Sequence, residues 1–418
     1  MRRFLVVLFA AALLVGLAVP AVSAAPIPET VTVAGPFAIG SPEAEALEAE
    51  LAAFTTENRV EVVFEEYFGD PVDLATGPEP PDLVITPQPA TLFEAAPYVV
   101  DLGEFVNERS LRRDFGDYLI DLASLDGVVL GAPIKVDLKS LVWYKPEMFA
   151  ANGYAIPQTF TELVALSDQM VANGQNPWCY YIGSGFATGW IGTDWVEDLL
   201  LSTDGPDVYD QWIDHTVVFQ DPRVEEAFER FEQMIGPGYV YDRGNMTSID
   251  FVFNVLPLGA GDCLMHKQAS FFAAFIPAFG FDLADFATFK FPAVNSEFDD
   301  SVFGGGVYVA ALNERPEVRQ LVRFMASRQF GREALADVGG WLLPNVRFDL
   351  NRYGDDLTRS FAEVVQAAIM AGQYRFDASD LMPPVVGSGE FWFGMRDLVD
   401  GVRTIPQVLA DIDAAWPS

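Results

Sequence analysis

Blocks of apolar residues separated by polar turns open the main part of the chain. Apolar runs at residues 31–34, 60–64 and 83–85 predict three strands. Between the first two runs, apolar side chains recur at i, i+4 and i+7, which predicts a helix that begins at Pro42 and is capped by Ser41. A strand, a helix and a strand at this spacing form a βαβ unit, whose two strands are parallel.

The loops that follow parallel strands meet at one edge of a sheet, where open α/β sheets bind ligands. We therefore expect residues 35–37 and 87–89 to lie near a binding site. Residues 128–144 predict two further strands around a polar centre at residues 135–139.

Three consecutive glycines, Gly304, Gly305 and Gly306, precede a predicted strand at residues 307–310 and a predicted helix at residues 316–327. Such glycines indicate a place where the backbone bends or where another group approaches closely. If this strand returns to the first sheet, the chain passes between two lobes more than once. Multiple crossings make a hinge with a cleft between the lobes.

Length and composition agree with two lobes. The chain has 418 residues, whereas one domain usually holds roughly 100–200 residues around its core. Half of the residues are hydrophobic, which is enough to fill two cores. The net charge of −35 repels nucleic acid and anionic lipid, so we expect no nucleic-acid partner. The fold class predicted is α/β.

The first 25 residues have the pattern of a secretory signal peptide. Arg2 and Arg3 precede an apolar run from Phe4 to Leu17, and small residues follow at Ser23 and Ala24. No cysteine follows the cleavage region, and no later stretch reaches the roughly 20 apolar residues that span a bilayer. We therefore expect a free periplasmic protein.

The two cysteines, Cys179 and Cys263, predict one disulfide in an oxidising compartment, and two buried free thiols are the alternative. The chain has two histidines, His215 and His266, and no Cys-x-x-Cys pair, so we expect no metal site and no cofactor.

An ordered series of segments carries a resemblance to a known family. The segments are VVLGAPIKVDLKSLVWYKPEMFAANGY, IPQTFTELVALSDQM, FGGGVYVA, VGGWLLPN and DLMPPVVGSGEFWFGM. In this order and spacing, from about Val31 to Trp416, they resemble the extracellular solute-binding proteins of family 1, the carbohydrate receptors of ABC importers related to maltose-binding protein. NPWCYYIGSGFATGW and GDCLMHKQASF are most similar to the branch that serves α-glucosides.

The resemblance implies a periplasmic binding protein type II fold, with two lobes, three hinge crossings and a sugar in the cleft between them. It places the first lobe at residues 26–136 and 304–352, and the second at residues 137–303 and 353–418. It also implies a monomer that delivers its carbohydrate to an ABC permease in the inner membrane.

The resemblance also implies particular ligand contacts. Asp137 occupies the place of a carboxylate that accepts from sugar hydroxyls, and Trp392 the place of a tryptophan that stacks on a glucose ring. Ala269 stands where a second stacking tryptophan is expected, so that stacking partner is absent or comes from elsewhere. Because sugars need flat rings for their faces and polar groups for their hydroxyls, the full set of candidate ligand contacts is Phe37, Gln88, Asp137, Trp190, Asp194, Trp195, His266, Gln268, Gly305, Trp341 and Trp392.

Simpler roles stay open for several of these residues. A tryptophan is more often core than ligand contact, and Trp341, after two glycines, could plug a hinge. Asp194 could cap a helix at residues 195–201, Asp137 could pair with a neighbouring lysine, and His266 could be a polar residue behind the disulfide.

The run Phe391-Trp392-Phe393 does not have helical spacing, so one ring is expected to face the cleft while its neighbours anchor the start of a helix in the core. A secreted glycoside hydrolase is the alternative function, since such enzymes use paired carboxylates. The sequence has no nucleophile elbow, P-loop or dinucleotide motif, and two histidines limit acid–base and metal chemistry. We therefore expect a binding protein and not an enzyme.

Overall fold

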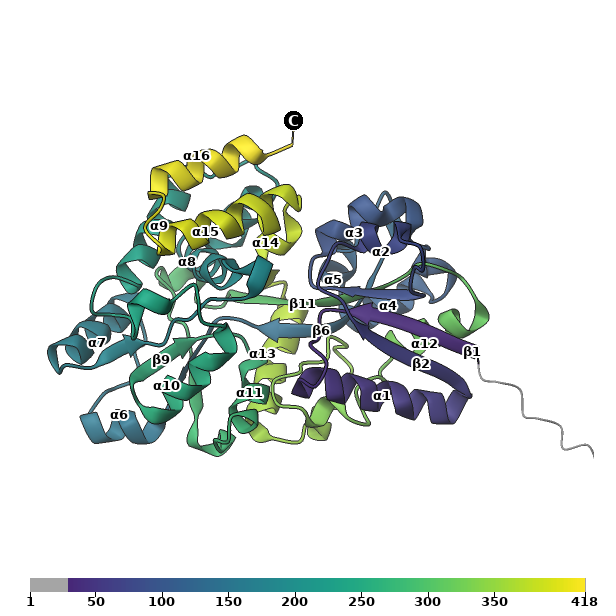
Figure 1. Cartoon of the computed structure of the whole chain (residues 1–418), viewed down its shortest axis with the longest axis horizontal. Helices are drawn as coiled ribbons and strands as arrows, with labels where there is room; N and C mark the ends of the chain where they lie inside the picture. The colour runs from purple at the N-terminus through teal and green to yellow at the C-terminus, as the bar shows by residue number, and fades with distance from the viewer. Residues whose placement is uncertain (1–28, 418) are drawn as a thin grey trace, which may run out of the picture.

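The computed structural model describes residues 29–417, which form two lobes side by side (Figure 1). The predicted signal peptide lies outside the described residues. The first lobe holds a six-stranded sheet of order β12-β11-β3-β1-β2, in which β6 also pairs with β11. Its strands are β1 Glu29–Gly35, β2 Val60–Glu66, β3 Leu83–Thr86, β6 Ala132–Leu138, β11 Val302–Ala311 and β12 Tyr374–Phe376. The short strands β4 Ser124–Leu125 and β5 Val128–Val129 pair separately.

The predicted βαβ unit is confirmed. Strand β1 pairs in parallel with β2 and with β3. The connecting helix α1, Pro42–Asn58, begins as predicted, because the Ser41 side chain accepts a hydrogen bond from the Ala44 amide at 3.2 Å. Its face of Leu47, Leu51 and Phe54 is buried against the sheet, and each such side chain contributes roughly 1.5–3 kcal/mol.

Other helices of the first lobe cover the same sheet, and their bounds are α2 Pro71–Thr76, α3 Pro89–Ala95, α4 Glu108–Phe115, α5 Asp117–Asp121 and α12 Pro316–Met325. In Figure 1 these helices surround the strands on the right-hand side of the view, opposite the second lobe.

Strand β11 confirms the expectation of close approach at the glycines. A Cβ at Gly304 would lie 2.2 Å from the Tyr374 hydroxyl oxygen, and one at Gly306 would lie 2.2 Å from the Lys135 carbonyl oxygen. The strand pairs with β3 in the first sheet, and its glycine end pairs with β6 and β12. It therefore returns to the first sheet, as the crossing argument requires.

The second lobe holds a four-stranded sheet of order β10-β7-β9-β8. Its strands are β7 Leu141–Tyr144, β8 Asn176–Trp178, β9 Cys263–Lys267 and β10 Ala287–Lys290. The predicted disulfide between Cys179 and Cys263 joins the end of β8 to β9. Its helices are α6 Pro146–Asn152, α7 Phe160–Ala172, α8 Trp190–Ile213, α9 Pro222–Met234, α10 Val255–Ala260, α11 Phe272–Ala278, α14 Ala378–Leu381, α15 Trp392–Val399 and α16 Ile405–Ala415.

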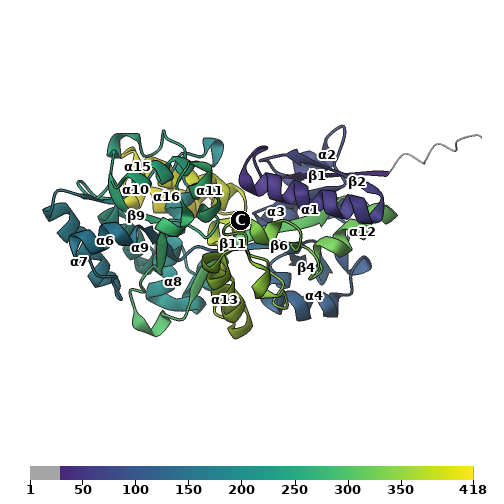
Figure 2. The same cartoon turned by 90° about the horizontal axis from the view of Figure 1, so that it is seen from below.

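Three connections join the two sheets: β6 to β7, β10 to β11, and β12 to α14. Strands β6 and β11 cross the middle of the molecule in Figure 1, and helix α13, Asp356–Ala371, lies at the junction in Figure 2. The predicted α/β fold with two lobes and three crossings is thus confirmed, while the exact lobe boundaries stay a prediction. Across residues 29–417, no helix combines the length and the apolar character needed to cross a membrane.

Two local predictions were wrong. The polar residues Lys135 and Asp137 lie inside strand β6 and not between two strands, because ion pairs satisfy their side chains there. Asp194 does not cap a helix: α8 begins at Trp190 after Gly189, and Asp194 lies within it.

Candidate ligand-binding cleft

A cavity of about 250 Å³ lies between the two lobes. The loops after the parallel strands β1 and β3 contribute Phe37 and Pro87, as expected at this edge of the sheet. The second lobe contributes the opposite wall. The residues that line the cavity are Pro36, Phe37, Glu43, Phe68, Pro87, Lys135, Asp137, Lys139, Ser184, Ala187, Trp190, Phe251, Phe271, Phe275, Gly306, Val307, Asp377, Asp380 and Trp392.

Aromatic rings form most of the apolar surface of this cavity. Seven of the lining residues are aromatic: Phe37, Phe68, Trp190, Phe251, Phe271, Phe275 and Trp392. Two of them rest on further rings, since Phe37 packs on Trp341 at 5.2 Å between centroids and Trp190 meets Phe251 edge-on at 5.2 Å. Such rings can cover the C–H faces of a flat, hydroxylated ligand.

The three aromatic side chains of Phe391, Trp392 and Phe393 have different surroundings. A π-helical turn ends at Phe391, which is fully buried, and α15 begins at Trp392. Trp392 lines the cavity while its indole N–H donates to the Ser379 hydroxyl at 3.1 Å. Phe393 is 39% exposed, so the prediction that both neighbouring rings anchor in the core is confirmed for Phe391 and wrong for Phe393. The hydrogen bond therefore holds the indole in one orientation at the cavity wall.

Lys135 forms the first of two buried lysine clusters. Its ammonium lies 2.9 Å from Glu43 in the first turn of α1 and 2.9 Å from Asp137 on its own strand. The same ammonium lies 5.0 Å from the centroid of the Phe271 ring and 5.5 Å from that of the Trp341 ring. Lys135 therefore connects α1 of the first lobe, strand β6 and an aromatic ring of the second lobe.

Lys139 forms the second cluster, at the break between β6 and β7. Its ammonium lies 2.7 Å from Asp194 of α8 and 2.6 Å from Asp377, which follows β12. Glu197 lies beside them and accepts hydrogen bonds from the amides of Ala378 and Ser379. The carboxylates of Asp194, Glu197 and Asp377 come close enough to hold a metal ion. Because the Lys139 ammonium already supplies the positive charge there, we assign no metal to this group.

Burial dominates the electrostatics of these clusters. It raises the pKa of Asp194 to about 7, although Lys139 acts in the opposite direction. It also raises the pKa of Glu43 against the effect of Lys135, and raises that of Asp380 with help from the charge of Asp377. Burial also acts to raise the pKa of Asp377, but the charge of Lys139 and the hydrogen bonds to Asp377 together lower it. Burial and neighbouring charges thus shift the pKa values of these carboxyl groups in different directions.

Four of the predicted contact residues line the cavity: Phe37, Asp137, Trp190 and Trp392. Gln88, just before α3, lies close enough to Asp380 of the second lobe to lower its pKa, against the larger effect of burial. Asp137 is also paired with Lys135, so its simpler predicted role applies as well. Gly305 lies behind the cavity wall, where a Cβ would come within 2.8 Å of the Lys139 side chain.

The remaining predicted contacts lie away from the cavity surface. Trp195 is buried among aromatic rings in the core of the second lobe. Trp341 lies fully buried beneath Phe37, and Asp194 is paired with Lys139. The ring Nδ1 of His266 hydrogen-bonds to the Cys179 carbonyl oxygen at 2.9 Å, and burial lowers its pKa to about 4. Gln268 is buried too, with its side-chain oxygen accepting from the Ala269 amide at 2.8 Å. For these five, the structure gives core or supporting positions.

Sequence reasoning missed several residues that the structure brings to the cavity. Phe271 and Phe275 come shortly after Ala269, the position where a stacking ring was expected. Their spacing of four residues puts both rings on one face of a helical segment, and this was a readable signal. Asp377 and Asp380 carried no comparable signal, because acidic residues are abundant throughout the chain.

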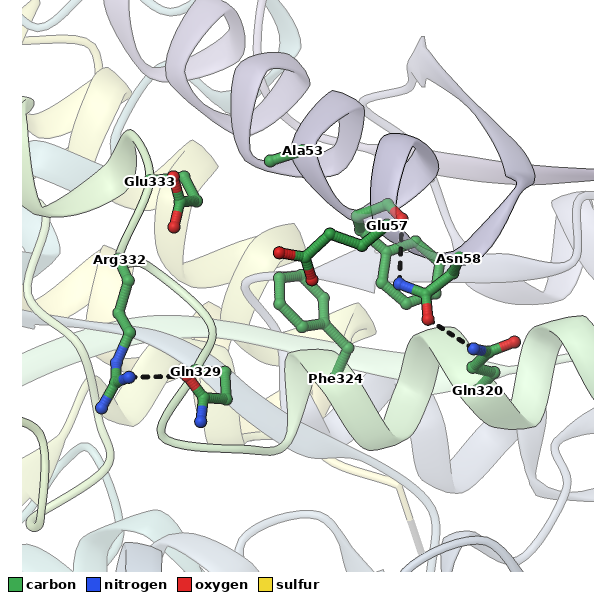
Figure 3. A pocket seen from close by; sticks show the side chains of 9 residues that line it. Ala53, Glu57, Asn58, Gln320, Phe324, Gln329, Arg332 and Glu333 are labelled. Carbon is green, nitrogen blue, oxygen red and sulfur yellow. Dashed lines mark hydrogen bonds between the residues drawn. The ribbon is translucent and has the colours of Figure 1, made fainter.

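A second hollow, of about 240 Å³, lies outside the cleft between α1 and α12 (Figure 3). Four of its polar side chains already bond in pairs: Gln320 donates to Asn58 at 2.6 Å, and Arg332 donates to Gln329 at 2.6 Å. Only the interlobe cavity combines rings, carboxylates and both lobes among the hollows of the described residues that we compared, so we place the ligand site there.

Comparison with known proteins gives the family. Residues 40–330 match the family described as "Bacterial extracellular solute-binding protein". The osmoprotective compounds-binding protein GgtB of Synechocystis sp. is 38% identical over 383 residues, which cover 89% of each chain. The alpha-glucosides-binding periplasmic protein AglE of Rhizobium meliloti is 33% identical over 417 residues, covering 93% of this chain and 87% of the relative.

Solved structures agree on the fold. A chitin oligosaccharide binding protein superimposes with a TM-score of 0.77 at 18% identity, covering 93% of this chain and 98% of that one. The two-lobed architecture, the interlobe cavity and the extent of the sequence match together show that this chain belongs to the bacterial extracellular solute-binding proteins.

Proposed function

We propose that the protein is the exported receptor of an ABC importer and that it captures a small carbohydrate in the cleft between its lobes. The observation that supports this most directly is the cavity wall, which combines seven aromatic rings with carboxylates. An α-glucoside or another small oligosaccharide is the ligand class we favour. The names of GgtB and AglE point the same way, since one binds osmoprotective compounds and the other alpha-glucosides.

The size of the cavity supports a small ligand. At about 250 Å³ it is below the roughly 300–1,000 Å³ that is usual for pockets of drug-sized molecules. A ligand of one or two sugar rings therefore suits it better than a long oligosaccharide.

Specific contacts follow for such a ligand. We propose that Trp392, Trp190 and Phe37 stack on its ring faces, and that Asp137 and Gln88 accept or donate at its hydroxyls. The other sequence candidates, such as His266 and Trp341, support these contacts from behind. Because the contacts come from both lobes, the ligand favours the closed arrangement, in which all of them are made at once.

The partner and the location belong to the same proposal. The closed receptor, acting as a monomer, would dock on a permease in the inner membrane, with the lobes divided at residues 26–136 and 304–352 against residues 137–303 and 353–418. A signal peptide at residues 1–25 would direct it to the periplasm. The carbohydrate leaves chemically unchanged.

The test titrates the purified mature protein with maltose, trehalose and sucrose. Tryptophan emission and the amount of intact sugar are followed together. A receptor changes its emission with saturation, because Trp392 and Trp190 line the cavity, and it leaves the sugar intact. Consumption of the sugar would instead favour the glycoside hydrolase, and no response to any carbohydrate would contradict the proposal.

A further inference from the structure

The charged groups around the cavity are unequal in number. Four carboxyl groups line it, those of Glu43, Asp137, Asp377 and Asp380, against the two ammonium groups of Lys135 and Lys139. Among the described residues that line the cavity, none is an arginine. The wall that meets a ligand therefore offers an excess of acidic groups.

Neither ammonium group is available to an anionic ligand. Lys135 lies 2.9 Å from both Glu43 and Asp137. Lys139 lies 2.7 Å from Asp194 and 2.6 Å from Asp377. Each lysine is buried and already shared by two carboxyl groups, so a third negative charge would have to compete with both.

Asp380 adds a carboxyl group without a cationic partner of its own. It is 8% exposed, and within residues 29–417 no ion pair to it is formed. Its amide donates to Asp377 at 3.1 Å, which brings a second carboxylate close. A ligand in the cavity therefore meets a buried carboxyl group that has no ion-pair partner of its own and lies beside the Asp377 carboxylate.

From this arrangement we propose that Glu43 and Asp380 determine the charge specificity of the cleft, so that it admits neutral carbohydrates and rejects anionic ones. Glu43 rejects anions because, together with Asp137, it already pairs with the Lys135 ammonium, so that this cation is not available to a ligand. Asp380 rejects them because it offers no cation at this wall and holds the negative charge of Asp377 close by, and like charges repel strongly in a site from which water is excluded. The inference rests on the proposed function, because it concerns the same cleft.

The experiment compares matched sugars that differ in one group. Maltose, trehalose and sucrose are each measured by calorimetry beside the corresponding uronic acid, in which a primary CH2OH group is a carboxylate. We expect the wild-type protein to bind the neutral member at least a hundredfold more tightly. In the variant Glu43→Gln/Asp380→Asn, this ratio should fall at least tenfold, because one lysine charge is released and one acidic group is removed.

The controls separate folding from specificity. Asp126→Asn changes an exposed carboxylate far from the cavity lining and should leave the ratio unchanged. The single variants Glu43→Gln and Asp380→Asn provide the same readout if the double variant does not fold. A wild-type protein that binds a uronic acid as tightly as its neutral partner would overturn the charge specificity alone. A ratio that stays constant in correctly folded variants would overturn the role of the two residues. Absence of binding by every sugar would overturn the proposed function, and this inference with it.

Discussion

The two lysine clusters have similar chemistry and different surroundings. In each, a buried ammonium group lies between two carboxylates, at 2.9 Å from both partners for Lys135 and at 2.6 and 2.7 Å for Lys139. Lys139 joins the hinge to α8, inside the second lobe. Lys135 joins the hinge to α1 of the first lobe and also faces the Phe271 ring of the second.

This difference separates support from recognition. In the Lys139 cluster, Lys139 and Asp377 line the cavity, but Asp194 and Glu197 do not, and Glu197 and Ser379 bind the start of α14 behind it. The Lys135 cluster forms part of the cavity wall between the lobes. We therefore expect changes in the Lys139 cluster to affect mainly stability, and changes in the Lys135 cluster to affect mainly ligand affinity.

The largest effect is expected for Lys139→Met. The substitution keeps most of the volume but leaves Asp194 and Asp377 buried without a counter-ion, so the free energy of unfolding should fall by about 3–5 kcal/mol. Urea unfolding followed by circular dichroism measures it. Lys290→Met is the control, since its 3.4 Å pair with Asp299 is exposed and should contribute less than about 1 kcal/mol. Equal losses in the two variants would contradict the buried role of Lys139.

The pH dependence of stability tests the carboxyl groups of the same cluster. The pKa of Asp194 is about 7 in the folded protein against a usual value of 3.8. The folded state therefore keeps a proton that the unfolded state loses. The stabilisation of the folded state by this proton is complete below about pH 4 and is lost as the pH rises to about 7. At 1.36 kcal/mol per pKa unit, the loss in the free energy of unfolding is at most about 4 kcal/mol.

Asp194→Asn should remove this slope. Urea midpoints measured between pH 4 and pH 8 would decline less with rising pH in Asp194→Asn than in the wild-type protein. Asp299→Asn, which changes an exposed carboxylate, should keep the wild-type profile. A profile for Asp194→Asn that parallels the wild type would show that another group controls this window.

Lys135→Met tests the other side of the comparison. It frees Asp137 and Glu43 from their shared partner, so we expect the binding free energy for the sugar to weaken by about 2–4 kcal/mol. Stability should fall less than in Lys139→Met, because the side chains of Glu43 and Asp137 are 13% and 8% exposed, against 6% and 3% for Asp194 and Asp377. Calorimetric titration and urea unfolding together measure both effects.

Lys145→Met is the matched control for Lys135→Met. Its ammonium donates to the Gly259 carbonyl oxygen at 3.1 Å, away from the cavity, and the sugar affinity should not change. If Lys135→Met lost as much stability as Lys139→Met and kept its affinity, the distinction between the two clusters would be wrong.

The fold was largely predictable from the sequence. Local patterns define the βαβ unit, since Ser41, Pro42 and the face of α1 need no distant partner to be recognised. The disulfide was readable because the chain has only two cysteines. The position of Lys135 and Asp137 inside a strand was not, because charged residues oppose a buried strand until their ion-pair partner Glu43, from another element, is known.

The site was less predictable than the fold. Burial of a tryptophan depends on packing between distant segments, so nothing local distinguishes Trp195 in the core from Trp190 at the cavity. Asp377 and Asp380 reach the cavity because β12 crosses to α14, which is a matter of topology. Trp392 was identified by the resemblance of its segment, since composition and spacing alone do not place it in a cleft.

The smallest effect is expected at this residue, where the ligand contact does not involve a charge. Trp392→Ala should weaken the binding of the sugar by about 1–3 kcal/mol, because the ring that covers the ligand face is lost. Phe393→Ala is a close control, one residue further along, where the ring is 39% exposed and does not line the cavity. Fluorescence or calorimetric titration compares the two variants, with circular dichroism to establish that both are folded. Unchanged affinity in Trp392→Ala would remove the stacking role, and equal losses in the two variants would point to a general disturbance of α15. A loss confined to Trp392 would place recognition on the ring itself, because both residues share the same helix and only one of them faces the cleft.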